Sequence, residues 1–144
     1  MQLNKGFTLL EMLVVLVIIG MLAGLVGPRL LENIDGAKVT TAETQIEMIK
    51  GAVMALSLHM ERVPTNEEGL ALLKIPPIDE NLKQFWKGPY LEKDLPLDPW
   101  NNSYQYSIPG ADNRKFALYS LGADGKLGGS EYDADLGYLP PKSY

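Results

Sequence analysis

The sequence predicts an α+β fold: one long N-terminal helix, membrane-spanning in its first half, packs on a small antiparallel sheet. Three observations lead to this prediction. An almost uncharged apolar run occupies residues 7–26, an amphipathic helical repeat follows it, and two alternating segments joined by a turn come after residue 103. A glycine-rich acidic loop closes the fold. The length of 144 residues suits one such domain plus an anchor.

The apolar run Phe7–Val26 contains twenty residues, and Glu11 is its only charged residue. A helix needs about 20 residues to cross the hydrocarbon core of a bilayer. A carboxylate inside a membrane helix costs about 2.5–3.5 kcal/mol on insertion scales, so one found there usually has a partner and a function. A secretory signal peptide would end its apolar region at a small-residue cleavage site. Here the apolar region continues into helix-like sequence, which favours a retained helix.

Three glycines and a proline weaken the second half of this helix: Gly20, Gly24, Gly27 and Pro28. Each interior Gly costs roughly 1 kcal/mol relative to Ala, and an interior Pro about 3 kcal/mol. Two interpretations stay open. The small residues can serve tight packing in a membrane, or the segment 20–28 can bend or unwind during assembly.

Past Pro28 the sequence predicts an amphipathic helix that ends near Arg62. Its charged residues fall largely off the apolar face, as expected for a solvated side. We therefore expect the apolar face to pack on the C-terminal domain. The apolar positions recur at alternating steps of four and three residues and form one stripe: Ala42, Ile46, Ile49, Val53, Leu56 and Met60.

The segment after this helix predicts a short second helix and then a long loop. Pro64 ends the first helix, and Thr65-Asn66-Glu67-Glu68 matches a capping box. The capped helix is expected over Gly69–Leu73. Residues 75–99 show little periodicity and are expected to form a connecting loop with one helical turn near residues 81–86.

Two segments near the C-terminus predict strands. Residues 104–108 alternate between side-chain types, and residues 116–120 are apolar with aromatic ends. Pro109-Gly110-Ala111-Asp112-Asn113 lies between them and has the composition of a turn. We therefore expect the two segments to pair as an antiparallel hairpin.

The stretch Leu121–Gly137 holds four carboxylates, one lysine and five glycines. Glycines let a backbone turn its carbonyls inward, and carboxylates supply hard oxygen, which suits the roughly six to eight oxygen ligands of Ca²⁺. It is not an EF-hand, since Lys126 occupies the third loop position and the terminal Glu is missing. The alternative interpretation is a solvated acidic tail.

Composition narrows the possible functions. The net charge of −5 argues against nucleic-acid binding. The chain has no cysteine, so it forms neither a disulfide framework nor a thiolate metal site. Its motifs include no nucleophile–base pair, phosphate loop or histidine-containing metal set, so we do not expect an enzyme.

The stretch Lys5-Gly6-Phe7-Thr8-Leu9-Leu10-Glu11, with the apolar run behind it, resembles the class III signal of type IV pilins and of type II secretion pseudopilins. The resemblance implies that a prepilin peptidase cuts between Gly6 and Phe7 and methylates the new N-terminus, so residues 1–6 form a leader peptide. It also implies that Glu11 pairs with the N-terminal amine of a neighbouring subunit, which makes a buried charge tolerable. The alternative is a single-pass anchor with a stray glutamate.

Two later segments resemble the major pseudopilins of type II secretion systems. The first is Gly88–Leu91 followed by Leu95–Tyr104, with its Asp-Pro-Trp sequence. The second is the acidic loop, which begins Leu-Gly-Ala-Asp-Gly and ends Asp-Ala-Asp-Leu-Gly. Because the family varies in length between these clusters, Glu131 stays an alternative to Asp133. The implied Ca²⁺ ligands are the side chains of Asp124, Asp133 and Asp135, with main-chain oxygens near Leu121, Lys126 and Ser130.

The resemblance implies a structural subunit of a periplasmic pseudopilus that drives export of folded proteins across the outer membrane. Residues 7–28 would be the transmembrane and polymerisation helix, and residues 29–144 the periplasmic pilin-like domain. The chain would cross the bacterial inner membrane once, with its N-terminus in the cytoplasm. Expected partners are other copies of the chain, the prepilin peptidase, minor pseudopilins and the inner-membrane assembly platform.

Two alternative functions stay open. One is a type IV pilin of an external fibre, although such pilins usually close their C-terminal region with a disulfide and this chain lacks cysteine. The other is a membrane-anchored calcium-binding module that never polymerises. Filament formation by the mature protein would separate this module from a pseudopilin.

Overall fold

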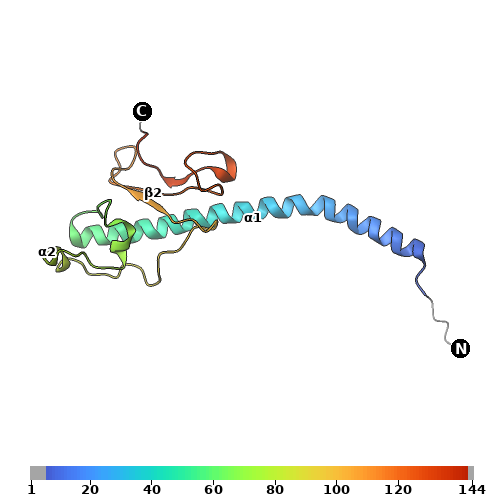
Figure 1. Cartoon of the computed structure of the whole chain (residues 1–144), viewed down its shortest axis with the longest axis horizontal. Helices are drawn as coiled ribbons and strands as arrows, with labels where there is room; N and C mark the ends of the chain where they lie inside the picture. The colour runs from blue at the N-terminus through green and yellow to red at the C-terminus, as the bar shows by residue number, and fades with distance from the viewer. Residues whose placement is uncertain (1–5, 143–144) are drawn as a thin grey trace. The chain divides into compact units, whose positions relative to one another are not determined.

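Helix α1 (Leu9–Met60) precedes all other elements in the computed structural model of the chain (Figure 1). The structure describes residues 6–142, except for the side chains of residues 27–32. It divides into two units, Met1–Gly36 and Ala37–Tyr144, and α1 contributes to both. The remaining elements belong to the second unit: η1 (Gly69–Leu73), α2 (Glu80–Lys83), β1 (Gln105–Ser107), β2 (Ala117–Ser120), η2 (Glu131–Asp133) and β3 (Leu136–Tyr138).

Helix α1 is continuous, and the backbone is helical at Gly20, Gly24 and Pro28. The weak positions therefore do not break the helix in this state. Their proposed unwinding during assembly stays a prediction.

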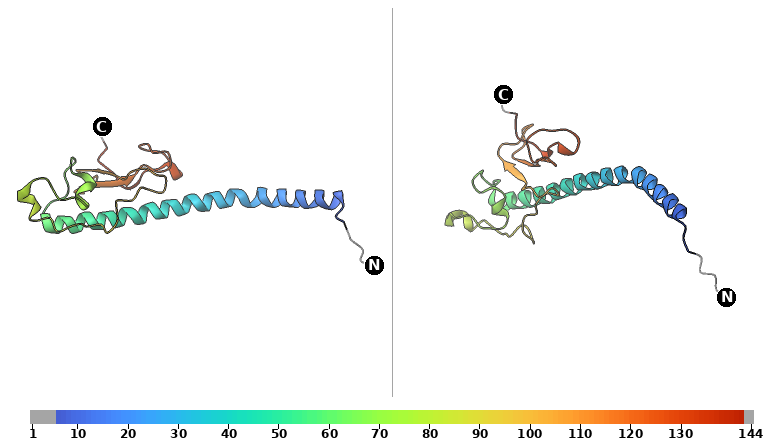
Figure 2. Two further views of the ribbon diagram at one scale, coloured as in Figure 1. Left: turned by 60° about the horizontal axis from the view of Figure 1, so that its bottom comes forward. Right: turned by 45° about the vertical axis from the view of Figure 1, so that its right-hand side comes forward.

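The core of the second unit forms around the amphipathic part of α1, as the periodicity predicts. Ala42, Ile49, Val53 and Leu56 are completely buried. Figures 1 and 2 show the strands lying beside this part of the helix. Residues from η1, from the following loop, from the position just before β1 and from β2 complete the core cluster: Leu70, Leu72, Leu73, Leu91, Tyr104 and Leu118.

The sheet is antiparallel with strand order β1-β2-β3. Its first two strands form the predicted hairpin, with Tyr106 opposite Leu118. The sequence does not predict the third strand, because Leu136 and Gly137 fall in the predicted acidic loop Leu121–Gly137. Gly137 lies opposite Tyr119 with a φ of +116°, and a Cβ there would stand 2.6 Å from the Leu118 carbonyl oxygen. Only glycine lets the chain approach β2 in this way.

The segment between α1 and the sheet begins with the predicted capping box. The Thr65 N–H donates to Oε2 of Glu68 (2.9 Å), and the Glu68 N–H donates to Oγ1 of Thr65 (3.2 Å). The helix that follows is a 3₁₀ helix, η1, which is common for such short pieces. Downstream, the expected helical turn is α2, and the Trp86 indole N–H donates to the Leu72 carbonyl (2.8 Å).

Candidate functional site

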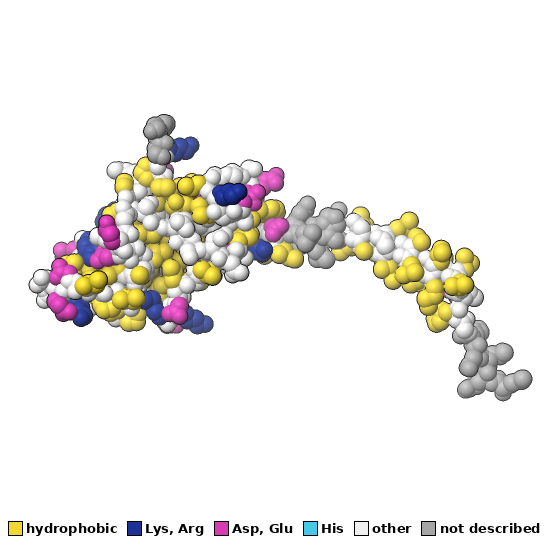
Figure 3. Space-filling view, viewed as in Figure 1, with side chains coloured by type: hydrophobic (Ala, Val, Ile, Leu, Met, Phe, Trp, Pro, Cys, Tyr) yellow, Lys and Arg dark blue, Asp and Glu magenta, His cyan; other side chains and the backbone are white. Residues whose placement is uncertain are grey.

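The first candidate site is the apolar part of α1, Leu9–Val26. Among the described residues this is the one helical stretch long and apolar enough to cross a membrane, with a mean hydropathy of 2.8. None of it is buried in the structure, and its large apolar side chains are 47–92% exposed. Figure 3 shows such side chains over much of the visible face of this stretch. An apolar surface of this extent marks a site for lipid or another protein.

Glu11 caps the helix that carries it. Its Oε2 accepts from the Thr8 N–H (2.8 Å) and from the Thr8 hydroxyl (2.9 Å), and its own N–H donates to Oγ1 of Thr8 (3.2 Å). This reciprocal arrangement satisfies donors that a helix N-terminus otherwise leaves free. This capping role of Glu11 was not predicted from the sequence, although Thr-x-x-Glu is a capping-box spacing. The pairing of Glu11 with a neighbour's amine stays a prediction.

The proposed processing site lies just before the helix. Phe7 is 79% exposed, and a Cβ built on Gly6 would meet no atom within 4 Å. The chain itself therefore does not require glycine at position 6. A peptidase that requires Gly6 stays a prediction.

The second candidate site is the acidic loop between β2 and β3. The carboxylate of Asp124 accepts from the Lys126 N–H (2.9 Å), and Oδ2 of Asp135 accepts from the Gly128 N–H (2.9 Å). Asp133 is exposed, and its N–H donates to the Ser130 carbonyl (3.0 Å) in η2. Leu121, another predicted ligand position, is half-buried and directly follows β2.

Glycines bring the two limbs of the loop together. Gly122 has a φ of +68°, and a Cβ there would stand 2.6 Å from the Ala134 carbonyl oxygen. Gly129 has a φ of +86° and lies against the Asp133 carbonyl. Between these points the Ala123 N–H donates to the Tyr132 carbonyl (2.9 Å). The loop is thus folded back on itself by its backbone.

The donor atoms of the loop fit calcium better than a metal that needs a side-chain cluster. In the part of the chain that the structure describes, no group of three or more His, Cys, Asp or Glu side chains is arranged to hold a metal. Oδ1 of Asp135, however, is buried and has no hydrogen-bond partner. Calcium is commonly bound by main-chain carbonyls together with a few carboxylates. The assignment of Asp124, Asp133 and Asp135 as ligands stays a prediction.

Tyr138, which follows the C-terminal limb of the loop, is hydrogen-bonded to α1. Lys50 Nζ donates to the Tyr138 hydroxyl (2.6 Å), and that hydroxyl donates to Oε1 of Glu47. The Tyr138 hydrogen bond, with help from Lys50, holds the pKa of Glu47 below its usual value. The same hydroxyl, with help from Glu47, raises the pKa of Lys50. Sequence reasoning missed this contact because it joins positions 88 residues apart.

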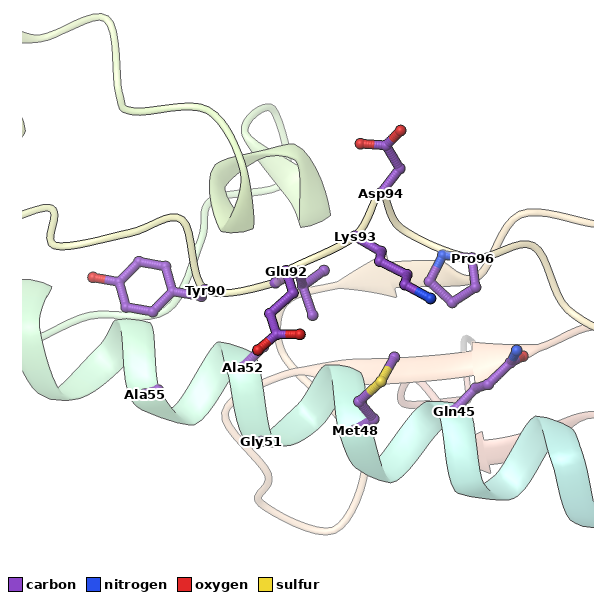
Figure 4. A pocket seen from close by; sticks show the side chains of 11 residues that line it. Gln45, Met48, Gly51, Ala52, Ala55, Tyr90, Glu92, Lys93, Asp94 and Pro96 are labelled. Atoms are coloured by element: carbon purple, nitrogen blue, oxygen red, sulfur yellow. The ribbon is translucent and has the colours of Figure 1, made fainter.

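A groove of about 600 Å³ lies between α1 and the segment 90–96 (Figure 4). Eleven residues from these two segments line the groove. They are Gln45, Met48, Gly51, Ala52 and Ala55 from α1, and Tyr90, Leu91, Glu92, Lys93, Asp94 and Pro96 from the segment.

Two family models match the chain and together cover both candidate sites. The model described as type II secretion system (T2SS), protein G, matches residues 29–139. The model of the prokaryotic N-terminal methylation motif matches residues 1–27.

Relatives match over nearly their whole length. The type II secretion system core protein G of Pseudomonas aeruginosa is 49% identical over 135 residues, which is 93% of this chain and 94% of the relative. The protein of the same name from Vibrio cholerae is 40% identical, over 95% of this chain and 92% of the relative. A crystal structure of the major pseudopilin from the type 2 secretion system of enterohaemorrhagic Escherichia coli superposes with a TM-score of 0.60 at 28% identity, covering 75% of this chain and 93% of that one.

Proposed function

Since the chain belongs to the type II secretion system protein G family, the major pseudopilins, we propose that it polymerises into a periplasmic pseudopilus. In this proposal it is a structural subunit and not an enzyme. Its filament would drive the export of folded proteins across the outer membrane.

The observation that carries the proposal is the unburied apolar helix Leu9–Val26 with its single carboxylate. Before assembly, lipid would cover this surface, and residues 7–28 would cross the inner membrane with the N-terminus in the cytoplasm. After assembly, the same helices of neighbouring subunits would cover one another. Residues 29–144 would then lie in the periplasm.

Assembly would follow processing. A prepilin peptidase would cut between Gly6 and Phe7, and the match to the N-terminal methylation motif supports this step. The new Phe7 amine of one subunit would then pair with Glu11 of a neighbour, and that contact would replace part of the Thr8 cap. Minor pseudopilins and the inner-membrane assembly platform are the further partners of this scheme.

We also propose that the acidic loop binds Ca²⁺. The buried, unpartnered Oδ1 of Asp135 supports this proposal. Bound calcium would offset the repulsion among the loop carboxylates. The residues that would hold it are Asp124, Asp133 and Asp135, with main-chain oxygens of Leu121, Lys126 and Ser130.

Electron microscopy tests the proposed polymer. The chain is overproduced together with its secretion apparatus, and filaments are identified with antibodies against residues 29–144. We expect labelled filaments with the full chain and none with a control that lacks residues 7–28. Processed chains that stay monomeric in the membrane under these conditions would contradict the proposal. Fibres on the cell surface at normal expression would favour a type IV pilin instead.

A further inference from the structure

We propose that Asp98 is a positioning residue for the acidic loop: its buried carboxylate, acting through the Ser120 hydroxyl, fixes the first turn of that loop in the shape that receives calcium. The proposal rests on the calcium site proposed above. The contacts that carry it belong to this chain alone, so they can be tested with and without the metal.

Asp98 is a buried carboxylate, only 3% exposed, and hydrogen-bond donors surround it. Its Oδ1 accepts from the N–H groups of Trp100 (3.0 Å) and Asn102 (2.8 Å). Its Oδ2 accepts from the hydroxyl of Ser120 (2.5 Å), a residue with no exposed surface. No ion pair involves Asp98 within residues 6–142. A buried charge supported only by hydrogen bonds requires these donors to stay in place.

The bond to Ser120 continues into the acidic loop. Oγ of Ser120 accepts from the Gly122 N–H (3.1 Å). The Gly122 carbonyl in turn accepts from the Asn102 side-chain amide (3.4 Å), and the Asn102 N–H returns to Asp98. The four residues thus form a closed ring of hydrogen bonds. This ring connects the turn at residues 98–102 with the end of β2.

Gly122 is where this ring meets both limbs of the loop. Its backbone has a φ of +68° and lies against the carbonyls of Asp133 and Ala134. The neighbouring Ala123 N–H is bonded to the second limb at Tyr132. Predicted calcium ligands lie within two residues of these contacts on both limbs. Holding Gly122 in place therefore holds the ligand-bearing segments at a fixed separation.

A narrower role for Asp98 would be to cap its own turn through Trp100 and Asn102 alone. The two roles differ in the use of Oδ2, because that oxygen bonds Ser120 and not the turn. Removing the Ser120 hydroxyl leaves the turn's own two bonds intact but removes the connection from Oδ2 to the Gly122 N–H, so that only the longer bond from the Asn102 side-chain amide to the Gly122 carbonyl (3.4 Å) remains. Groups that orient a metal ligand without touching the metal typically change metal affinity about 10–100-fold when they are mutated.

The test uses the full chain in detergent micelles, with the variants Ser120→Ala, Asp98→Asn and the double variant. Ser107→Ala on β1 and Asp94→Asn, whose side chain is fully exposed, are the matched controls. Hydrogen–deuterium exchange of residues 121–135 is measured in chelator, and the calcium dissociation constant is measured by calorimetry. Protection of β1 and β2 reports whether each variant keeps its fold.

We expect both single variants to exchange faster over residues 121–135 in chelator and to bind calcium roughly 10–100-fold more weakly, while β1 and β2 stay protected. The double variant should bind about as weakly as the weaker single variant, since the two groups act together. Unchanged loop exchange in Ser120→Ala, or additive losses in the double variant, would overturn the proposal. A wild-type chain that binds no calcium refutes the metal site, while the exchange measured in chelator still decides the role of Asp98.

Discussion

Two stretches of the same helix, Leu9–Val26 and Ala42–Met60, show how differently one secondary structure can be used. Both are rich in apolar residues, yet none of the first stretch is buried, whereas the second buries a complete stripe. In the second stretch, polar residues separate the apolar ones so that these fall on one face. In the first, apolar side chains surround the helix. The pattern of apolar residues, and not their number, therefore decides whether one face of the helix or its whole circumference must be covered.

The charged groups differ in the same way. Among the residues that the structure describes, Glu11 in the first stretch has hydrogen bonds only with Thr8, three residues before it. Glu47 and Lys50 in the second stretch bind Tyr138, which lies far along the sequence. The second stretch therefore has its partners within its own chain. The first leaves its surface, and in our proposal its carboxylate, available to other copies.

The largest effect is expected from Gly6→Val, which should prevent maturation and leave the first stretch attached to its leader. Because a Cβ at Gly6 meets nothing in this chain, the loss would reflect a side chain clashing with the peptidase. Mass spectrometry of membrane fractions should find only the uncleaved precursor. Gly24→Ala, also free of contacts, is the control and should be cleaved normally. A mature chain that begins anywhere other than Phe7 would contradict the processing site.

The next effect concerns Glu11→Gln, which keeps the helix apolar but removes the charge proposed to pair with the Phe7 amine. Membrane insertion should be maintained or improved, because the desolvation cost of a charged side chain, about 2.5–3.5 kcal/mol at the centre of a membrane helix, is reduced. Filament number and protein secretion should fall sharply. Glu43→Gln is the matched control, an exposed carboxylate on the same helix, and should secrete normally. Normal secretion by Glu11→Gln would refute the pairing.

A leucine-to-alanine pair compares the two stretches directly. Leu56→Ala removes a completely buried side chain and should lower the free energy of unfolding by about 2–5 kcal/mol. Leu16→Ala alters a side chain that is 68% exposed and should leave that free energy nearly unchanged. Denaturant titration followed by fluorescence of Trp86 and Trp100 measures both. Equal losses would mean that the first stretch is packed within the monomer.

The second stretch and the hairpin could be predicted from the sequence because their signals are local. A stripe repeating every three to four residues and a turn between two alternating segments each lie within a short window. The capping box Thr65–Glu68 was likewise predicted from four adjacent residues and is confirmed.

The parts that were missed depend on contacts between distant positions. Strand β3 is three residues long with a glycine at its centre, and it forms only because β2 offers an edge. The buried ring through Asp98 and Ser120 joins residues 22 positions apart, and nothing in either local sequence indicates burial. The family resemblance implies a metal site in the acidic loop, and this site stays a prediction. The resemblance could not predict that the three aspartates do not form a side-chain cluster in this structure.

Calcium should stabilise the unit Ala37–Tyr144, which contains the acidic loop, and leave the stretch Leu9–Val26 unaffected. Because the metal binds the folded loop preferentially, stabilisation should be about 2.7 kcal/mol at a hundredfold excess over its dissociation constant. Mg²⁺ should substitute poorly, since it demands a tighter octahedral geometry. Asp124→Ala should abolish the shift while cleavage at Gly6 continues. An identical Tm in chelator and in millimolar Ca²⁺ would return the loop to a solvated acidic tail.

The smallest effect is expected from Glu68, whose carboxylate accepts two hydrogen bonds from Arg62 (2.6 and 2.7 Å). These bonds, above all other contacts, hold the pKa of Glu68 below its ordinary value of 4.5. A lowered carboxyl pKa contributes stability that is complete above the ordinary value and disappears as the pH falls through the lowered one. Glu68→Gln should therefore lower the free energy of unfolding by about 1 kcal/mol at about pH 7.

That difference between wild type and Glu68→Gln should close as the pH is lowered from about 5 to about 2, because the wild-type carboxylate is then protonated as well. Denaturant titrations across this range measure it. Glu67→Gln, an exposed neighbour, is the control and should show little difference at any pH. A Glu68→Gln deficit that persists unchanged at the acid end would mean that its cause is altered packing around Arg62. The charge of Glu68 would then not contribute to the stability of the unit Ala37–Tyr144.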